Sequence, residues 1–333
     1  MYGKKTVDTD YLYATARIRA VEAADSLHEK NEKMLNAPDF SEAVSVLLGS
    51  AAAENINSGN YQTVLDGELV KSYDLVGSML GDNPIMTIFK CPYDCNNLKL
   101  AIKSEIKGVK STDMYYTFGT VSVSELENAM HERDFSAFPK NMAAAASDAL
   151  EAYSKNGDPQ TIDIVIDRAC LTDMLEMATG FGCEYLTNIV KNKVDSYNIL
   201  GFIRCTRMKK SAEFYRKLSL DGGTVDCGNI ISAYENGLEA LAELLKSSHY
   251  SSVYDTIIAQ LAEPAKGFFS NVERRLENVS SARVEEVKYI AFGPEIPVSF
   301  LITREKELKN AGIILAGKSA GLETDAIRER LRV

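Results

Sequence analysis

Apolar residues recur at helical spacing along almost the whole chain, which predicts an all-α protein. Near the N-terminus the apolar face holds Tyr13, Ala16, Ala20, Ala23, Ala24 and Leu27, and a second clear stripe holds Leu238, Leu241, Leu244 and Leu245. Asp8 and Asp10 precede the first stripe and Pro38 follows it, as is typical of helix ends. These limits predict a first helix of about 27 residues, or roughly 40 Å at 1.5 Å per residue.

One segment fits two kinds of secondary structure. The run from Thr161 to Asp167 alternates apolar and polar residues like a strand. Ile162, Ile166 and Ala169 also fall on one helix face, with Thr161 as the N-cap. Because the neighbouring segments have helical periodicity, we favour the helix.

A pattern of an acidic residue, two other residues and an asparagine, followed by an apolar helical run, occurs three times. The copies are Asp94 to Asn97, Asp195 to Asn198 and Glu307 to Asn310, about a hundred residues apart. A glycine and a new helix start follow each copy, at Gly119-Thr120-Val121-Ser122, Gly223-Thr224-Val225-Asp226 and Gly321-Leu322-Glu323-Thr324. Self-similarity at a fixed period indicates one structural unit used repeatedly.

The repeat predicts three similar helical lobes with pseudo-threefold symmetry. One lobe spans 70–168 and another 169–272. The third copy starts near 273 and lacks most of its second half, so we expect residues 1–69 to pack against 273–333 and complete the remaining lobe. A body of this kind suits a socket or a cap better than an enzyme with a cleft.

Composition narrows the function. The 333 residues are 45% hydrophobic. Their net charge of −10 argues against nucleic acid as a partner, because phosphates need a basic face. No apolar run is long enough for a membrane span, and no secretory signal is present. The irregular spacing of the six cysteines predicts reduced thiols in a cytosolic setting.

Two motifs resemble catalytic or binding chemistry. Gly312 to Ser319 satisfies the phosphate-binding pattern G-x-x-x-x-G-K-S, but charged helical residues precede it where a P-loop needs a buried strand. We therefore interpret it as a packed helix. Cys91 and Cys95 lack a second pair at zinc spacing, and a helix start at Pro92 explains that segment better. We expect no cofactor, no metal and no catalytic residue.

The two ends of the chain carry the most specific resemblance. Tyr11-Leu12-Tyr13-Ala14-Thr15-Ala16-Arg17-Ile18-Arg19 is similar to the first-helix signature of the C subunit family of vacuolar-type and archaeal-type rotary ATPases, whose eukaryotic member is called the d subunit. The C-terminal Phe292-Gly293-Pro294-Glu295, Arg304 to Asn310, Gly317-Lys318 and Ile327 to Arg332 resemble the family more closely. The repeated aspartate and asparagine positions match between these ends, so the resemblance covers essentially the whole chain.

The resemblance implies three helical lobes that form a funnel, and a rotor role without chemistry. The protein would sit on the cytoplasmic face of the membrane, on the proteolipid ring of c/K subunits. It would receive the D and F subunits of the central stalk, meet the a/I subunit of the membrane stator in passing, and transmit torque for proton or sodium transport. A cytosolic helical scaffold and a P-loop nucleotide-binding protein stay as alternatives.

The expected interface or structural residues come from the matching segments. Arg17 and Arg19 face different sides of the first helix, and either Arg17 points inward to a carboxylate or both are solvated. The three repeated asparagines either tie their helix to a neighbour by a buried amide or line the funnel. The full set is Tyr13, Arg17, Arg19, Asn97, Lys99, Asn198, Arg204, Glu305, Glu307, Asn310, Lys318, Arg328 and Arg330.

Overall fold

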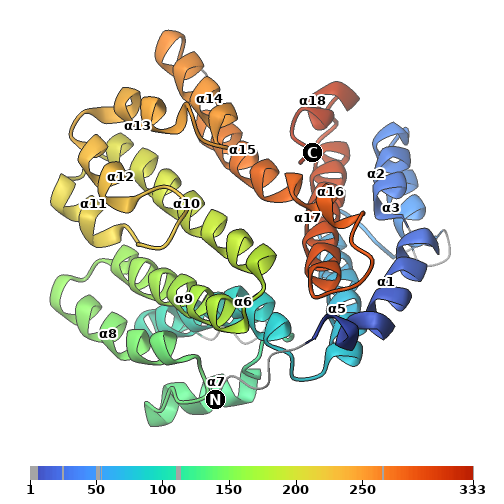
Figure 1. The fold of residues 1–333 in the computed structure, drawn as a ribbon, viewed down its shortest axis with the longest axis horizontal. Helices are drawn as coiled ribbons and strands as arrows, with labels where there is room; N and C mark the ends of the chain where they lie inside the picture. The colour runs from blue at the N-terminus through green and yellow to red at the C-terminus, as the bar shows by residue number, and fades with distance from the viewer. Residues whose placement is uncertain are drawn as a thin grey trace. The chain divides into compact units, whose positions relative to one another are not determined.

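The computed structural model describes residues 7–24, 26–49, 53, 55–109, 114–264 and 266–332. Every regular element in these ranges is a helix, which confirms the all-α prediction (Figure 1). The chain divides into two compact units. The first unit holds the described residues between 82 and 248, and the second holds those between 7 and 81 and between 249 and 332.

The first unit is built around one long helix. Its elements are α6 (Pro84–Lys107), α7 (Val123–Glu132), α8 (Lys140–Asn156), α9 (Pro159–Phe181), α10 (Glu184–Arg207), α11 (Ala212–Leu218), α12 (Cys227–Tyr234) and α13 (Gly237–Leu245). Helix α9 packs against α6, α8 and α10. The predicted leucine stripe lies on α13, where Leu241 and Leu245 are buried.

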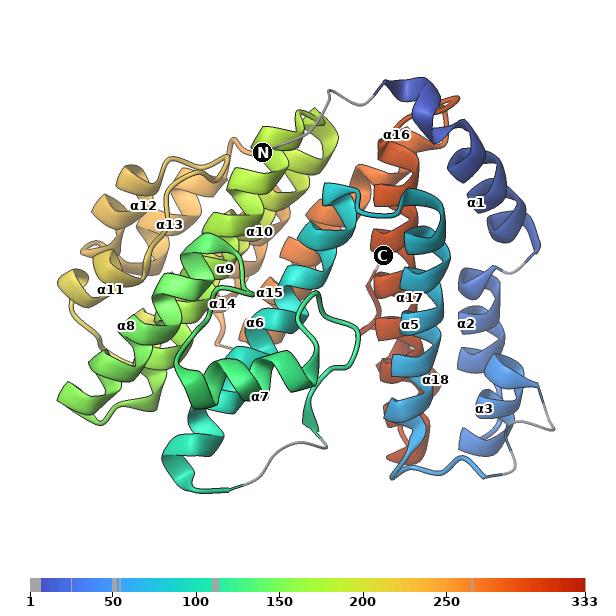
Figure 2. The same ribbon diagram turned by 90° about the horizontal axis from the view of Figure 1, so that it is seen from below.

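The second unit joins the two ends of the chain. Its elements are η1 (Asp8–Tyr11), α1 (Leu12–Ala24), α2 (Leu27–Asn36), α3 (Phe40–Leu48), α5 (Tyr61–Leu80), α14 (Ser251–Ala262), α15 (Phe268–Ala282), α16 (Val284–Val287), α17 (Glu295–Ser319) and α18 (Thr324–Arg328). Helix α17 packs against α1, α2, α3, α5, α16 and α18 (Figure 2). The N-terminal segment therefore covers the C-terminal helix, while the division into three lobes and the funnel stay predictions.

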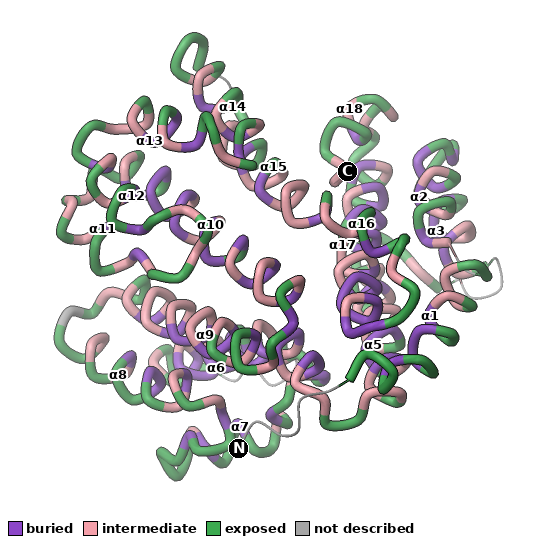
Figure 3. The backbone as a smooth tube through the Cα atoms, in the orientation of Figure 1, coloured by how far each residue is buried: buried purple, intermediate pink, exposed green. Residues whose placement is uncertain are grey.

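The core of the second unit lies between α17 and α2. Met34 and Leu35 of α2 meet Ala311 and Ile314 of α17, and all four are completely buried. Figure 3 shows this burial along α17. Burying a side chain of the size of leucine stabilises a fold by about 1.5–3 kcal/mol, so this contact fixes the two chain ends together.

The predicted first helix is wrong in length and in its buried face. The side chain of Ser26 accepts a hydrogen bond from the N–H of Glu29, so a new helix, α2, begins there. Tyr11, Ala14 and Ile18 are the buried hydrophobic residues of the first segment. The predicted stripe from Tyr13 to Ala24 is exposed instead.

Two other expected helix starts are also wrong. The segment from Thr161 to Asp167 is helical as favoured, but Asp158 caps α9 by accepting a hydrogen bond from Gln160, with Pro159 as the first helical residue. Pro92 does not begin a helix, because α6 starts at Pro84 and contains Pro92 in its interior. In both helices the residue at the start is a proline, whose missing N–H costs nothing there.

Candidate functional site

Asp94 and Asn97 lie three residues apart on α6 and hold the backbone of the loop that follows this helix. The amide of Asn97 donates to the carbonyl of Tyr116 at 2.7 Å and accepts from its N–H at 2.8 Å. The carboxylate of Asp94 accepts from the N–H and hydroxyl of Thr120, at 2.9 and 2.5 Å, and from the N–H of Val121 at 3.1 Å. We call this arrangement the carboxylate–amide bracket.

The same bracket recurs on α10. Asn198 donates to the carbonyl of Leu220 at 2.8 Å and accepts from its N–H at 2.9 Å. Asp195 accepts from the N–H and hydroxyl of Thr224, at 2.9 and 2.5 Å, and from the N–H of Val225 at 3.1 Å. The sequence repeat therefore encodes a repeated set of hydrogen bonds between a long helix and its following loop.

Both brackets require a glycine immediately before the threonine. A Cβ atom on Gly119 would lie 2.1 Å from a carboxylate oxygen of Asp94, and one on Gly223 would lie 2.0 Å from that of Asp195. Burial raises the pKa of Asp94, and the hydrogen bonds from Thr120 and Val121 oppose that effect. The close backbone approach explains the glycine in both loops, and the hydroxyl hydrogen bond explains the threonine that follows it.

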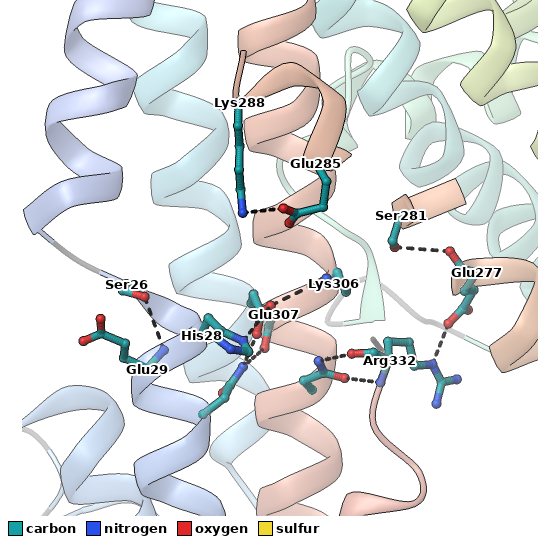
Figure 4. A network of polar contacts seen from close by, with 12 residues as sticks. Ser26, His28, Glu29, Glu277, Ser281, Glu285, Lys288, Lys306, Glu307 and Arg332 are labelled. Carbon is teal, nitrogen blue, oxygen red and sulfur yellow. Dashed lines mark hydrogen bonds and ion pairs between the residues drawn. The ribbon is translucent and has the colours of Figure 1, made fainter. Parts of the chain in front are cut away.

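The third copy is completed by a different element. Asn310 on α17 donates to the carbonyl of Arg332 at 2.9 Å and accepts from its N–H at 2.8 Å. The carboxylate of Glu307 accepts from the side chain of Asn31 on α2 at 2.7 Å, and Nδ1 of His28 lies 3.6 Å from it (Figure 4). In this copy α2 supplies the hydrogen-bond donor to the carboxylate, whereas the Gly-Thr-Val loop supplies the donors in the other two copies.

Gly321 precedes the start of a new helix, α18, as expected, but it does not meet a carboxylate as Gly119 and Gly223 do. Gly108, Lys209 and Gly321 each lie eleven residues beyond the bracket asparagine, and all three have a left-handed backbone with φ of 65°, 54° and 68°. Each ends its long helix or closes the turn that follows it. Gly321 therefore matches the residue that terminates the helix, and not the loop that meets the carboxylate.

The other predicted residues of α17 and the C-terminal segment mostly fasten these parts to the N-terminal elements. Glu305 accepts from the hydroxyl of Tyr73 on α5 at 2.5 Å. Lys318 donates to the carbonyl of Ala37 at 2.5 Å, and Arg328 lies 3.3 Å from Glu32 on α2. Arg330 is exposed, and its carbonyl accepts a hydrogen bond from the guanidinium of Arg332.

The predicted residues of α1 lie on different sides of that helix. Arg17 is exposed and donates to the hydroxyl of Tyr13 at 3.0 Å, so of the two alternatives for this residue, the one in which it points inward to a carboxylate is wrong. Arg19 is half-buried, pairs with Glu22 at 2.9 Å and donates to the carbonyl of Val287 at 3.0 Å. Arg19 therefore anchors α1 to the end of α16.

Lys99 and Arg204 both belong to the first unit. Lys99 on α6 pairs with Asp167 on α9 at 2.5 Å, which joins two long helices. Arg204 is exposed on α10. Neither side chain contributes to the hydrogen bonds of a bracket described above.

The segment that matches the phosphate-binding pattern is part of an unbroken helix. Gly312 to Ser319 is the last part of α17, and Ala311, Ile314, Leu315 and Gly317 within or next to it are buried. In a helix the backbone N–H groups bond to carbonyls four residues earlier, so they do not converge on a phosphate. The interpretation of this segment as a packed helix is confirmed.

Sequence reasoning missed a cluster of three thiols. The Sγ atoms of Cys91 and Cys170 lie 3.6 Å apart between α6 and α9, and Cys95 lies 3.4 Å from the carboxylate of Asp167. Hydrogen bonding to a neighbouring thiol and burial raise the pKa of Cys95 and of Cys170, which keeps both protonated. Separation by about 80 residues in sequence hid this cluster.

Neither a metal-binding cluster nor a membrane helix occurs among the described residues. They contain no group of three or more His, Cys, Asp or Glu residues that could hold a metal ion. None of the helices in these ranges is long and apolar enough to cross a membrane. Sequence reasoning also missed Asn31 and the exposed Tyr289, which no periodic pattern marks.

Similarity to known proteins extends over nearly the whole chain. The family model of the ATP synthase (C/AC39) subunit matches residues 14–330. The C subunit of the V-type sodium ATPase of Enterococcus hirae is 22% identical over 273 residues, which cover 82% of each chain. The C subunit of the A-type ATP synthase of Thermococcus onnurineus is 22% identical in an alignment 350 residues long, which covers 96% of this chain and 90% of the relative. This chain therefore belongs to the ATP synthase (C/AC39) subunit family.

Proposed function

We propose that this protein is the non-catalytic central-rotor subunit of a V/A-type ATPase. It couples the D and F subunits of the central stalk to the membrane proteolipid ring, on the cytoplasmic face, and transmits torque for proton or sodium transport. The observation that carries this proposal is the family match over residues 14–330, together with relatives named as the C subunit of such ATPases that align along most of their own length.

The brackets support a role in force transmission. A protein that carries torque must not yield where its helices meet their loops. Buried charged and amide side chains that each satisfy several backbone groups make such joints costly to open, since an orphaned buried group costs about 1–3 kcal/mol. In this protein each of the three long helices of the repeat has such a joint in its C-terminal half.

Ion pairs between α15, α17 and the chain end stiffen the second unit in the same way. Glu277 on α15 lies 2.5 Å from the guanidinium of Arg332 (Figure 4). It also pairs with Lys309 on α17. Arg332 is at the same time the backbone partner of Asn310. One acidic residue thus links two helices and the C-terminal segment.

The proposal is tested by a tagged pull-down from detergent-solubilised native membranes, with the co-purifying chains identified by mass spectrometry. Recovery of the proteolipid and of the D and F stalk subunits is the expected result. Recovery of the protein alone, or of soluble partners only, would limit the family relationship to a shared fold.

A further inference from the structure

A pocket lies between α14 and α15, which pack side by side in the second unit (Figure 1). Its volume is about 290 Å³, at the lower end of the range that small-molecule sites occupy. We call it the α14–α15 pocket. The proposed rotor function assigns no role to it.

Three hydrogen-bond donors form one wall of the α14–α15 pocket. Asn271, Arg274 and Arg275 all line it, and they lie three and four residues apart on α15. This spacing places them on one face of the helix. The amide and the two guanidinium groups together offer more N–H donors than any neutral wall of this size. A negatively charged ligand would therefore meet several donors from a single helix.

One of these donors is buried and lacks an acceptor. Nη1 of Arg274 donates to the carbonyl of Glu329, but its Nε is buried and has no hydrogen-bond partner among the described residues. Buried polar atoms in proteins are nearly always hydrogen-bonded, so an orphaned one calls for a ligand or an ordered water. Because Arg274 lines the pocket, an acceptor bound there can satisfy this N–H.

The arginine wall also carries uncompensated positive charge. Arg275 is exposed and makes no hydrogen bond or ion pair with any residue that the structure describes. Burial and the charges of Arg275 and Arg332 lower the pKa of Arg274, and the charge of Glu329 opposes them. An anion between the two guanidinium groups would relieve this repulsion.

The facing side of the pocket limits the size and charge of the ligand. Asp255 on α14 and Glu263 just beyond its end are exposed and line the same pocket. All four charged residues are described, and neither acid forms an ion pair with Arg274 or Arg275. The two carboxylates would repel a ligand with many negative charges, such as a nucleoside triphosphate. A small oxyanion with one or two charges fits both walls.

We propose that the α14–α15 pocket binds a small free oxyanion of the phosphate type through Asn271, Arg274 and Arg275. The planar guanidinium group matches the oxygen atoms of phosphate and donates two parallel hydrogen bonds to them. A ligand that binds the folded state alone stabilises it, so the bound anion should raise the stability of the protein. This site does not depend on the rotor function proposed above.

The test measures thermal unfolding of the purified full chain against the concentration of inorganic phosphate, with sodium chloride at matched ionic strength. Phosphate also stabilises proteins in general because it is excluded from their surface, so charge variants with opposite effects decide the result. Arg275→Gln removes a donor and a positive charge, whereas Asp255→Asn removes an opposing negative charge. The control Arg216→Gln removes an exposed arginine from α11 in the other unit.

We expect the melting temperature of the wild type to rise with phosphate and to reach a plateau. The half-saturating concentration should be about tenfold higher in Arg275→Gln, since a charge-assisted hydrogen bond is lost. It should be lower than that of the wild type in Asp255→Asn and unchanged in Arg216→Gln. All three substitutions are at exposed positions, so each variant should fold.

Two results would overturn the site. One is an equal response of the wild type and the variants to phosphate, or no response beyond that to sodium chloride. The other concerns the source of the phosphate group and uses phosphatidylcholine vesicles with and without phosphatidic acid. Binding to phosphatidic acid that Arg275→Gln abolishes, without any response to free phosphate, would assign the pocket to a lipid headgroup instead. Neither result bears on the rotor function.

Discussion

Asn198 is completely buried on α10, and the two ends of its amide are both bonded to the backbone of Leu220. Replacement by alanine would leave that N–H and carbonyl without these partners. The amide pairs recur at Asn97 and Asn310. The hydrogen bonds agree with a structural role for these residues, and a contact with a partner at the same positions stays a prediction.

We predict that Asn198→Ala lowers the free energy of unfolding by about 1–3 kcal/mol, as expected for orphaned buried groups. Denaturant unfolding followed by circular dichroism measures this change. The control is Asn229→Ala, an exposed asparagine on α12. A normal stability for Asn198→Ala combined with loss of stalk binding would show that the amide serves the partner instead.

The glycines of the brackets give a second prediction at this scale. Gly223→Ala should destabilise the protein by more than about 1 kcal/mol, since its Cβ would overlap the carboxylate of Asp195. Gly67→Ala, in the interior of α5 with no atom within 4 Å of the new Cβ, should stabilise it by about 0.5–1 kcal/mol. If both variants change the stability in the same direction, the close approach of Gly223 to the carboxylate of Asp195 would be contradicted. Melting temperatures measured side by side distinguish these results.

At the scale of helices and loops, the sequence predicted element type well and helix ends poorly. Helical periodicity identified α13 and the helical state of α9. The break between α1 and α2 was missed because the capping role of Ser26 is a matter of local backbone geometry, and apolar residues continue on both sides of it. Tertiary contacts then decide which face of α1 is buried, and the periodic pattern alone indicated the wrong face.

We expect the link between α15, α17 and the chain end to depend on pH. Burial by itself would raise the pKa of Glu277, but the hydrogen bonds from Lys309 and Arg332 lower it below its ordinary value of 4.5. A carboxyl group with a lowered pKa in the folded state stabilises the protein above its unfolded pKa, and this contribution is lost as the pH falls through the folded pKa.

We therefore predict that Glu277→Gln lowers stability at pH 7 by a modest amount, up to about 1 kcal/mol for a partly exposed ion pair. The variant should lose less stability than the wild type between about pH 5 and the acid range below the folded pKa. Chemical denaturation at neutral pH and at several acid pH values measures both quantities. Parallel pH profiles for the two proteins would mean that the ion pairs do not contribute.

At the scale of the whole molecule, the repeat was visible in sequence because buried polar side chains must keep their partners. Asp94, Asp195 and their asparagines are fixed by hydrogen bonds that few other residues can make. The sequence did not show that α2, and not a following loop, contacts the carboxylate of Glu307, because Asn31 lies 276 residues away in the chain. Family membership could be predicted from the two ends, and the match to residues 14–330 confirms it.

The proposed coupling of the central stalk to the membrane ring is tested most directly by ion transport. ATP-driven transport is measured in membrane vesicles from which the protein has been depleted, before and after addition of the purified chain. We predict that depletion abolishes transport and that the wild-type chain restores it. Transport that is unchanged by depletion, or that stays absent after the chain has rebound, would contradict the coupling role.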